Sequence, residues 1–311
     1  MRFEIVKCHG SGNDFPMIDA RALTLSDAEW AGVARALADR RGPVGGDGLL
    51  LLVPGDERAA FGMVMRNSDG SEAETCLNGV RCVARAGFEA LGMEAATVRL
   101  KTSHADAVHD ADLAPGVYTV RETAGPAGLS TAAWPIVGAP DMLIDAVLPM
   151  LDPERRFTAV TMPNPHLVHF TGTVDEAELV RLGTLCEAAP DWLPNRANVS
   201  FVEVRGDALF VRTFERGVGL TDSCGSAMAA STYAACLTGR IAWDVPTVVF
   251  NRGGLVRAFA REDGMVTLSG NATYEWAGSV EVDLASETAS DLTVDQRFPH
   301  EIAAWEAARR G

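Results

Sequence analysis

The stretch that decides the fold reads Asn67-Ser-Asp-Gly-Ser-Glu-Ala-Glu-Thr-Cys76-Leu-Asn-Gly-Val-Arg-Cys82. About 150 residues later a second stretch reads Glu215-Arg-Gly-Val-Gly-Leu-Thr-Asp-Ser-Cys224-Gly-Ser-Ala227. In both, a polar loop that contains glycine ends in a cysteine, and the residues after it, 80–91 and 227–237, have helical character. Each cysteine is therefore predicted to lie where a helix begins.

A helix start changes the chemistry of a thiol because it carries unpaired N–H groups and the positive end of the helix dipole. A cysteine there can have its pKa lowered from about 8.5 to between about 3.5 and 7.5. The same N–H groups can hold a substrate carboxylate. Because Cys76 and Cys224 follow polar loops, we interpret them as reactive thiols with a lowered pKa, although buried structural cysteines are the commoner kind. Four cysteines in apolar or mid-helix surroundings are interpreted as packing residues: Cys8, Cys82, Cys186 and Cys236.

Composition narrows the class of protein. With 311 residues, of which 47% are hydrophobic, the chain can form one large domain or two of about 150 residues, and the recurring cysteine loop favours two. The net charge of −15 argues against a nucleic-acid partner. The longest aliphatic run, residues 49–53, is too short to span a membrane, and residues 1–10 lack the apolar core of a signal peptide. We therefore expect a cytoplasmic protein with reduced thiols and without a zinc site.

Five short motifs follow one another along the chain. They are His9-Gly-Ser-Gly-Asn-Asp-Phe15, residues 67–82, Asn164-Pro-His166, Asn195-Arg-Ala-Asn-Val199 and residues 215–226. In this order they resemble the motifs of the diaminopimelate epimerase family. Its members invert one α-carbon of diaminopimelate, without a cofactor, in the pathway to lysine and the cell wall. The resemblance covers almost the whole chain.

The resemblance implies an α/β (α+β) fold of two similar domains. Each would be a curved mixed β-sheet wrapped around a central helix, with the active site in the cleft between the domains. The expected N-terminal half comprises residues 1–125 and a returning strand near 271–284, and the expected C-terminal half comprises residues 126–270. The Gly-, Pro- and Ala-rich stretch 124–139 is predicted to be a linker. Residues 285–311 are expected as a C-terminal extension of unknown role, which ends in an amphipathic segment.

The resemblance also implies roles for individual residues. Cys76 and Cys224 would be catalytic, and His166 would lie beside the thiols as an auxiliary residue. The residues expected to bind the substrate are Asn13, Asn67, Asn164, Asn198, Glu215 and Arg216 through side chains, and Leu77, Asn78, Gly225 and Ser226 through main-chain amides. Arg216 suits a bidentate grip on a distal carboxylate. The alternative roles are structural, because asparagine often serves only a turn and Glu215-Arg216 could be a surface pair.

Two thiols satisfy the chemistry of epimerisation. Inversion needs a base on one face of the α-carbon and an acid on the other, so one cysteine would act as thiolate and the other as thiol. The two lysines, Lys7 and Lys101, lie outside the five motifs, which argues against a pyridoxal Schiff base. No cofactor or metal is expected. The expected partner is a small amino acid, with no nucleic acid and no membrane, and a homodimer is one expectation for the assembly.

Three positions depart from the family pattern. Leu77 replaces a usual glycine after the first catalytic cysteine, Leu220 replaces a usual glutamate, and Ala227 stands where glycine commonly follows. These changes keep a second reading open, a racemase for another amino acid on the same scaffold. The related phenazine-biosynthesis fold lacks the cysteine pair, which disfavours an isomerase of that kind. A third reading, from another class, is a non-catalytic amino-acid-binding protein or a thiol redox protein.

Overall fold

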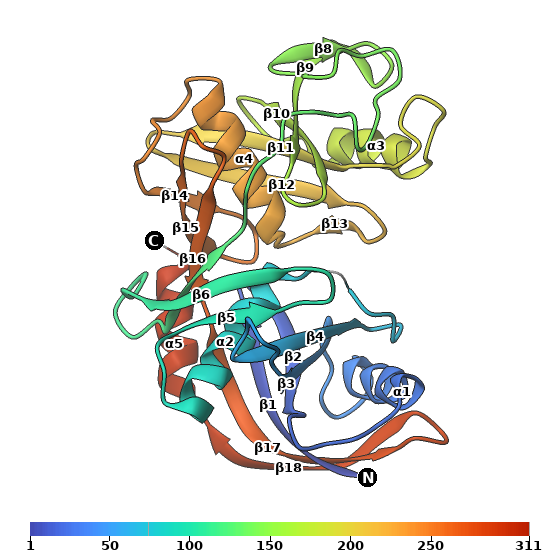
Figure 1. Ribbon diagram of the computed structural model, residues 1–311, viewed down its shortest axis with the longest axis vertical. Coiled ribbons are helices and arrows are strands. Elements are labelled where there is room, and N and C mark those ends of the chain that lie inside the picture. The colour runs from blue at the N-terminus through green and yellow to red at the C-terminus, as the bar shows by residue number, and fades with distance from the viewer. Residues whose placement is uncertain (74, 311) are drawn as a thin grey trace. The chain divides into compact units, whose positions relative to one another are not determined.

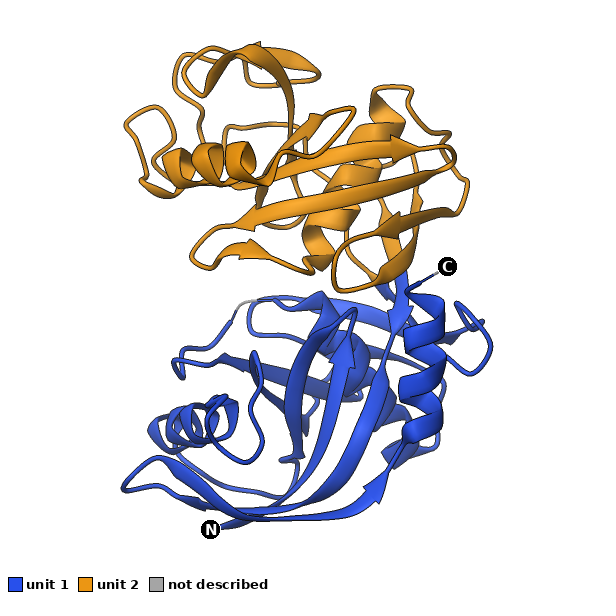
Figure 2. Cartoon of the chain, turned by 180° about the vertical axis from the view of Figure 1, so that it is seen from behind, with its two compact units in different colours: residues 1–122, 269–311 blue, residues 123–268 orange. Residues whose placement is uncertain are grey.

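The computed structural model describes residues 1–73 and 75–310. It divides into two compact units (Figure 2): unit 1, residues 1–122 and 269–311, and unit 2, residues 123–268. The chain thus changes unit after Glu122 and after Leu268, where the sequence led us to expect 125 and 270. Unit 1 is built from both ends of the chain, whereas unit 2 is one continuous segment.

Unit 1 is a mixed sheet with helices on both faces (Figure 1). Its strands are β1 (Arg2–Gly10), β2 (Asn13–Asp19), β3 (Gly48–Pro54), β4 (Phe61–Asn67), β5 (Ala95–Arg99), β6 (His104–Asp110), β7 (Thr119–Thr123), β17 (Thr273–Asp283) and β18 (Thr288–Arg297). Its helices are α1 (Asp27–Ala38), α2 (Leu77–Leu91) and α5 (Pro299–Ala308). The strands pair in the order β18, β17, β1, β2, β3, β4, β5, β6, β7, with β2–β3 and β4–β5 parallel and the others antiparallel.

The central strand β3 shows why this sheet has two covered faces. Its four consecutive leucines are all buried, and successive side chains of a strand point to opposite faces. Leu50 and Leu52 join the apolar cluster that contains α2, whereas Leu49 and Leu51 join the cluster that contains α1. Helix α2 contacts strands from β1 to β6, which are far apart in the strand order, so the sheet curves around it.

Unit 2 has the same plan. Its strands are β8 (Ala146–Leu148), β9 (Asp152–Thr161), β10 (Pro165–Phe170), β11 (Asn198–Arg205), β12 (Ala208–Glu215), β13 (Gly219–Thr221), β14 (Thr247–Phe250) and β15 (Leu255–Ala260), with β16 (Val266–Asn271) leading back to unit 1. Its helices are α3 (Glu176–Glu187) and α4 (Gly225–Leu237). Helix α4 contacts β9, β10, β11, β12, β14 and β15. It is buried almost all round, which its small side chains permit. The expected fold of two similar halves, each a mixed sheet around a central helix, is confirmed.

Two local expectations were wrong. The predicted linker, residues 124–139, belongs to the body of unit 2, because Trp134 and Ile136 are buried in its apolar core. The second expectation concerned the acidic stretch between Thr102 and Val117, which the sequence predicts to be a connection between strands at 96–102 and 117–122. It contains strand β6, which pairs with β5 and β7. In β6 the buried positions are alanines, whose small side chains give a weak hydrophobic pattern.

The C-terminal residues 285–310 are folded onto unit 1. Strand β18 pairs with β17, and helix α5 is fixed to α2 by Glu301, whose carboxylate accepts two hydrogen bonds from Arg85 at 2.6 and 2.9 Å. The same carboxylate accepts the N–H of Tyr274 at 3.0 Å. Trp305 is 2% exposed and its ring centroid lies 5.8 Å from that of His9. The extension thus packs against the strand that leads into the first motif.

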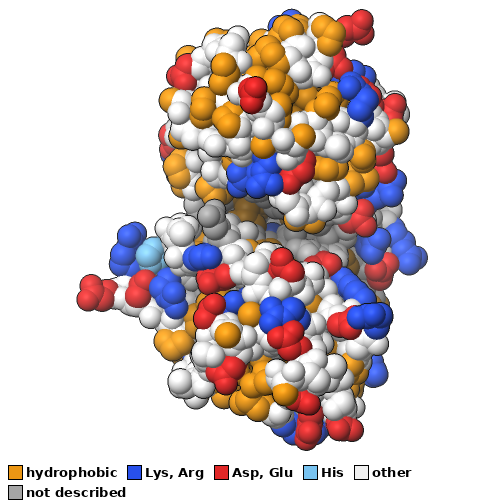
Figure 3. All heavy atoms as spheres, turned by 90° about the vertical axis from the view of Figure 1, so that its right-hand side faces the viewer, with side chains coloured by type: hydrophobic (Ala, Val, Ile, Leu, Met, Phe, Trp, Pro, Cys, Tyr) orange, Lys and Arg blue, Asp and Glu red, His pale blue; other side chains and the backbone are white. Residues whose placement is uncertain are grey.

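The surface carries basic side chains among acidic ones. On the face shown in Figure 3, Lys and Arg side chains lie close to Asp and Glu side chains. Ion pairs of this kind within unit 2 join Arg181 to Glu178 at 2.6 Å and Arg205 to Glu203 at 2.6 Å. No helix among the described residues is both long and apolar enough to cross a membrane.

Replacing Glu301 with alanine should destabilise unit 1, because the Arg85 guanidinium, in a side chain only 8% exposed, loses its buried carboxylate partner and keeps only the half-exposed Glu89. Breaking a buried pair on one side typically costs about 3–5 kcal/mol. The measurement is the free energy of unfolding in urea. Ile302→Ala, at the exposed neighbouring position of α5, is the control and should change it by about 0.5 kcal/mol or less. Equal losses in the two variants would contradict the importance of this ion pair.

Candidate active site

The first motif forms a tight turn that presents Asn13. Strand β1 ends at Gly10 and β2 begins at Asn13, so only Ser11 and Gly12 connect them, with φ of 52° and 81°. Two positive φ values in a two-residue connection are typical of a type I′ hairpin. The Ser11 N–H donates to Asn271 Oδ1 at 2.6 Å, which holds the turn in place. The two glycines in residues 9–13 predict a loop over this stretch, but all of it except Ser11 and Gly12 belongs to β1 and β2.

The turn lies directly against the start of α2. A Cβ on Gly10 would lie 2.7 Å from the carbonyl oxygen of Asn78, so only glycine allows this approach. Cys76 is the N-cap residue of α2, and its Sγ accepts the N–H of Gly79 at 3.4 Å. The thiol of Cys76 and Nδ2 of Asn78 both donate to Asn13 Oδ1, at 3.8 and 3.4 Å. The structure therefore brings three predicted site residues of unit 1 together.

The other two predicted residues of unit 1 have different surroundings. Asn67 closes the turn after β4: its N–H donates to the carbonyl oxygen of Ser71 at 2.8 Å and its Nδ2 to Ser71 Oγ at 3.0 Å. These contacts agree with the turn role that the sequence left open. Leu77, the first residue of α2, is 6% exposed. The start of a helix is in general a place where an anion can bind, because the helix itself supplies no acceptor for its first N–H groups.

In unit 2, four predicted residues form one hydrogen-bonded chain. Strands β10 and β11 are parallel and place His166 opposite Asn198. The His166 Nε2 lies 2.8 Å from Asn164 Oδ1, and Asn198 Nδ2 lies 3.5 Å from the imidazole nitrogens. Asn198 Oδ1 accepts the N–H of Arg216 at 2.7 Å. Burial, and after it the positive charge of Arg216, lower the pKa of His166 to about 3, so this imidazole is neutral at physiological pH.

The second cysteine lies at the start of α4. Cys224 is the N-cap residue and is 9% exposed, with its Sγ 3.5 Å from Ser226 Oγ. Ser226 and Gly225 form the first turn of the helix. Glu215 accepts a hydrogen bond from Thr221 Oγ1 at 2.5 Å and also contacts the Cys224 thiol. Cys224, Ser226 and Glu215 therefore form a second cluster in unit 2.

The lowered pKa predicted for Cys224 is wrong for this structure. Burial raises the pKa of the Cys224 thiol well above its ordinary value, and the negative charge of Glu215 raises it further. Hydrogen bonds from Ser226 and the Ala227 N–H act in the opposite direction but are weaker. Burial also raises the pKa of Glu215. The thiol form of Cys224 is thus favoured, because removing an ion from water outweighs the effect of the helix start.

Arg81 is a residue that the sequence analysis missed. It is fully buried and donates to Asn78 Oδ1 at 2.6 Å, to Ser11 Oγ at 3.2 Å and to Glu122 Oε1 at 2.6 Å. It thereby joins the first turn of α2 to the turn before Asn13. Its position three residues after Asn78 puts both on one helix face, and this spacing was the available signal. Among the described residues, no cluster of His, Cys, Asp and Glu could hold a metal ion.

The His166 imidazole should stay neutral between pH 5 and pH 8. Its pKa of about 3 is below the ordinary 6.5, so on acidification the unfolded chain takes up this proton before the folded chain does. The contribution of His166 to stability should therefore fall as the pH drops from about 6.5 towards 3. Imidazole nitrogen shifts in NMR spectra, assigned with the His166→Gln variant, should be constant from pH 5 to pH 8. A titration midpoint within that range would contradict the assignment.

The chain is similar to known proteins over most of its length. The family model described as diaminopimelate epimerase matches residues 5–110 and 158–275, which include every predicted site residue. The chain is 35% identical over 303 residues to the diaminopimelate epimerase of Clostridium acetobutylicum, covering 95% of this chain and 90% of that protein. It is 34% identical over 273 residues to that of Geobacillus kaustophilus, covering 87% and 93%.

Solved structures with low sequence identity share the fold. A phenazine biosynthesis protein of the PhzF family from Bacillus anthracis matches with a TM-score of 0.65 and 14% identity, over 91% of this chain and 100% of that chain. A hydroxyproline epimerase from Agrobacterium vitis matches with a TM-score of 0.62 and 16% identity, over 99% and 97%. At such identity these likenesses concern the fold alone. The family model and the sequence relatives identify this chain as a member of the diaminopimelate epimerase family.

Proposed function

We propose that this isomerase interconverts LL- and meso-diaminopimelate by a two-thiol mechanism without a cofactor. The observation that carries the proposal is that Cys76 and Cys224 are each the N-cap residue of the buried central helix of their unit. The names of the sequence relatives support the substrate. A cytoplasmic location and a homodimer, expected from the sequence, stay part of the proposal.

In the proposed mechanism each thiol serves one face of the α-carbon. Cys224 enters as the neutral thiol, because burial and Glu215 disfavour its ionised form. In the direction of reaction that starts with a neutral Cys224, the Cys76 thiolate removes the α-proton and Cys224 donates its proton to the opposite face. In the reverse reaction the two cysteines exchange roles. The N–H groups of Leu77, Asn78, Gly225 and Ser226 hold the α-carboxylate and stabilise the charge that develops beside it.

Recognition of the distal end of the substrate is assigned to the polar residues of unit 2. The guanidinium of Arg216 is oriented by its Nη1, which donates to the carbonyl oxygen of Asn195 at 3.1 Å. An arginine can bind a carboxylate through two parallel hydrogen bonds, which gives both strength and direction. The neutral His166 keeps Asn164 and Asn198 in place and adds no charge beside them. From unit 1, Asn13 and Asn67 complete the proposed set of substrate-binding side chains.

Alanine at position 76 or 224 should lower turnover of diaminopimelate by about 100-fold or more, the usual contribution of a general acid or base. The measurements are epimerisation and exchange of the α-proton with deuterium oxide. Cys82→Ala on α2 and Cys236→Ala on α4 are matched controls, because these buried cysteines lie on the same two helices. Full activity in the Cys76→Ala or the Cys224→Ala variant would contradict the two-thiol mechanism. Exchange in wild-type protein would also exclude a binding or redox protein.

The substrate proposal predicts a preference for LL-diaminopimelate over amino acids without a distal carboxylate. Loss of a bidentate pair with Arg216 should cost at least about 1.4 kcal/mol, which is tenfold in kcat/KM. A panel of proline, hydroxyproline and lysine, none of which has a distal carboxylate, measures this preference. A tenfold preference for proline or hydroxyproline would favour the second candidate, a racemase on the same scaffold. The small buried Ala227 and the buried Leu77 are the departures that motivate this comparison.

A further inference from the structure

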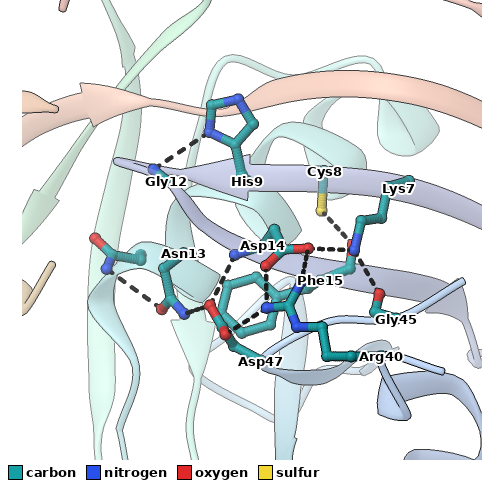
Figure 4. A network of polar contacts seen from close by, with 11 residues as sticks. Lys7, Cys8, His9, Gly12, Asn13, Asp14, Phe15, Arg40, Gly45 and Asp47 are labelled. Atoms are coloured by element: carbon teal, nitrogen blue, oxygen red, sulfur yellow. Dashed lines mark hydrogen bonds and ion pairs between the residues drawn. The ribbon is translucent and has the colours of Figure 1, made fainter. Parts of the chain in front are cut away.

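The side-chain amide of Asn13 has a defined orientation in the structure. Figure 4 shows Asn13 beside Asp47, and the Asn13 Nδ2 donates to Asp47 Oδ2 at 2.5 Å. A carboxylate is only an acceptor, so the amide nitrogen must face Asp47 and the amide oxygen must face the other way. That oxygen is the atom that accepts from Cys76 and Asn78. The orientation of Asn13 is therefore set from both sides, by Asp47 at the amide nitrogen and by the weaker 3.4 Å contact from Asn78 Nδ2 at the amide oxygen.

Asp47 is itself held by charged neighbours. Arg40 Nη2 donates to Asp47 Oδ1 at 2.7 Å and to Asp14 Oδ1 at 2.6 Å, and the N–H of Asp14 donates to Asp47 Oδ2 at 3.1 Å. Lys7, which is 5% exposed, forms an ion pair with Asp14 and donates to the carbonyl oxygen of Gly45 at 2.5 Å. Although burial opposes it, the hydrogen bonds from Arg40 and Lys7 hold the pKa of Asp14 below its ordinary value. The charges thus alternate from Lys7 to Asp47 (Figure 4).

We propose that Asp47 is a positioning residue, which fixes the Asn13 amide so that its oxygen, and not its nitrogen, faces the Cys76 thiol. Asp47 acts through Asn13, and no contact with substrate or with Cys76 is invoked for it. The inference rests on the proposed role of Cys76.

The orientation matters because the two ends of an amide favour opposite forms of a thiol. An oxygen accepts the S–H hydrogen bond and favours the neutral thiol, whereas an N–H donor would favour the thiolate. The Gly79 N–H at 3.4 Å and the helix start favour the thiolate of Cys76. Asn13 Oδ1 counteracts these groups, so Cys76 can hold a proton in the direction of reaction in which it is the acid. Without Asp47 the 3.4 Å hydrogen bond from Asn78 Nδ2 is left to oppose rotation of the amide, so the Asn13 nitrogen faces the thiol more often.

The test measures ionisation of Cys76 without turnover. Cys76 is alkylated with iodoacetamide across a pH series in a Cys224→Ala background, and the modified peptide is quantified by mass spectrometry. Asp47→Ala should lower the midpoint of the rate profile by about one pH unit. Asp47→Asn removes the same charge but keeps one acceptor oxygen, so its midpoint should lie closer to that of the parent. Asp39→Ala, which removes a surface carboxylate paired with Arg41, is the matched control and should leave the midpoint unchanged.

A double-mutant cycle with Asn13→Ala separates orientation from charge. If Asp47 acts through Asn13, Asp47→Ala should shift the midpoint only when Asn13 is present. Three outcomes would overturn the proposal. Asp47→Ala could leave the midpoint unchanged, it could shift the midpoint as far in the Asn13→Ala background as in the parent, or Asp47→Asn could shift the midpoint as far as Asp47→Ala does. Near-ultraviolet circular dichroism establishes that each variant is folded, and the exposed position of Asp47 favours this. Because the readout is alkylation, its outcome stays independent of whether diaminopimelate is the substrate.

Discussion

The structure depends on one constraint: the first N–H groups of a buried helix need hydrogen-bond partners that the helix itself cannot supply. In each unit a mixed sheet curves around one such helix, α2 or α4, and the residue at its start is a cysteine. In α2 the Cys76 sulfur meets one of these N–H groups, that of Gly79. In unit 1, Gly10 lets the first hairpin approach the first turn of α2, and Arg81 joins the two. The two cysteines are therefore located where the main packing elements of the molecule begin.

Much of this arrangement could be predicted from the sequence, and the reasons are local. Ser26 and Glu29 form the capping box that starts α1, Cys76 and Cys224 start the two central helices, and strands β3, β11 and β12 follow their apolar patterns closely. Strand β6 could not be predicted because its buried residues are alanines. The contacts of Arg81 and Asp47 could not be predicted because they join residues that are distant in sequence. The segment 124–139 has the composition of a linker, yet two of its large apolar residues, Trp134 and Ile136, are buried in the core of unit 2.

Electrostatics in the two units illustrate how burial competes with helix ends. The sequence places both cysteines at helix starts, which alone would favour thiolates. The structure adds burial and Glu215 to Cys224, and these favour the thiol. Similarly, His166 has the residue type of a proton carrier, but burial keeps it neutral and leaves it as a hydrogen-bonding partner of Asn164. Burial therefore decides which of these side chains are charged as much as residue type does.

Unit 1 contains both ends of the chain, and this has a consequence during synthesis. Strand β1 lies between β2 and β17, the N-terminal amine donates to the carbonyl oxygen of Val282, and Trp305 packs on His9. Unit 2 is continuous, so a ribosome releases all of it before it releases β17, β18 and α5. Since domains generally fold as units, unit 2 has its full sequence first, whereas strand β1 of unit 1 must wait for its partner β17. The Asn13 turn, whose Ser11 N–H donates to Asn271, acquires this support only after all of unit 2 has been translated.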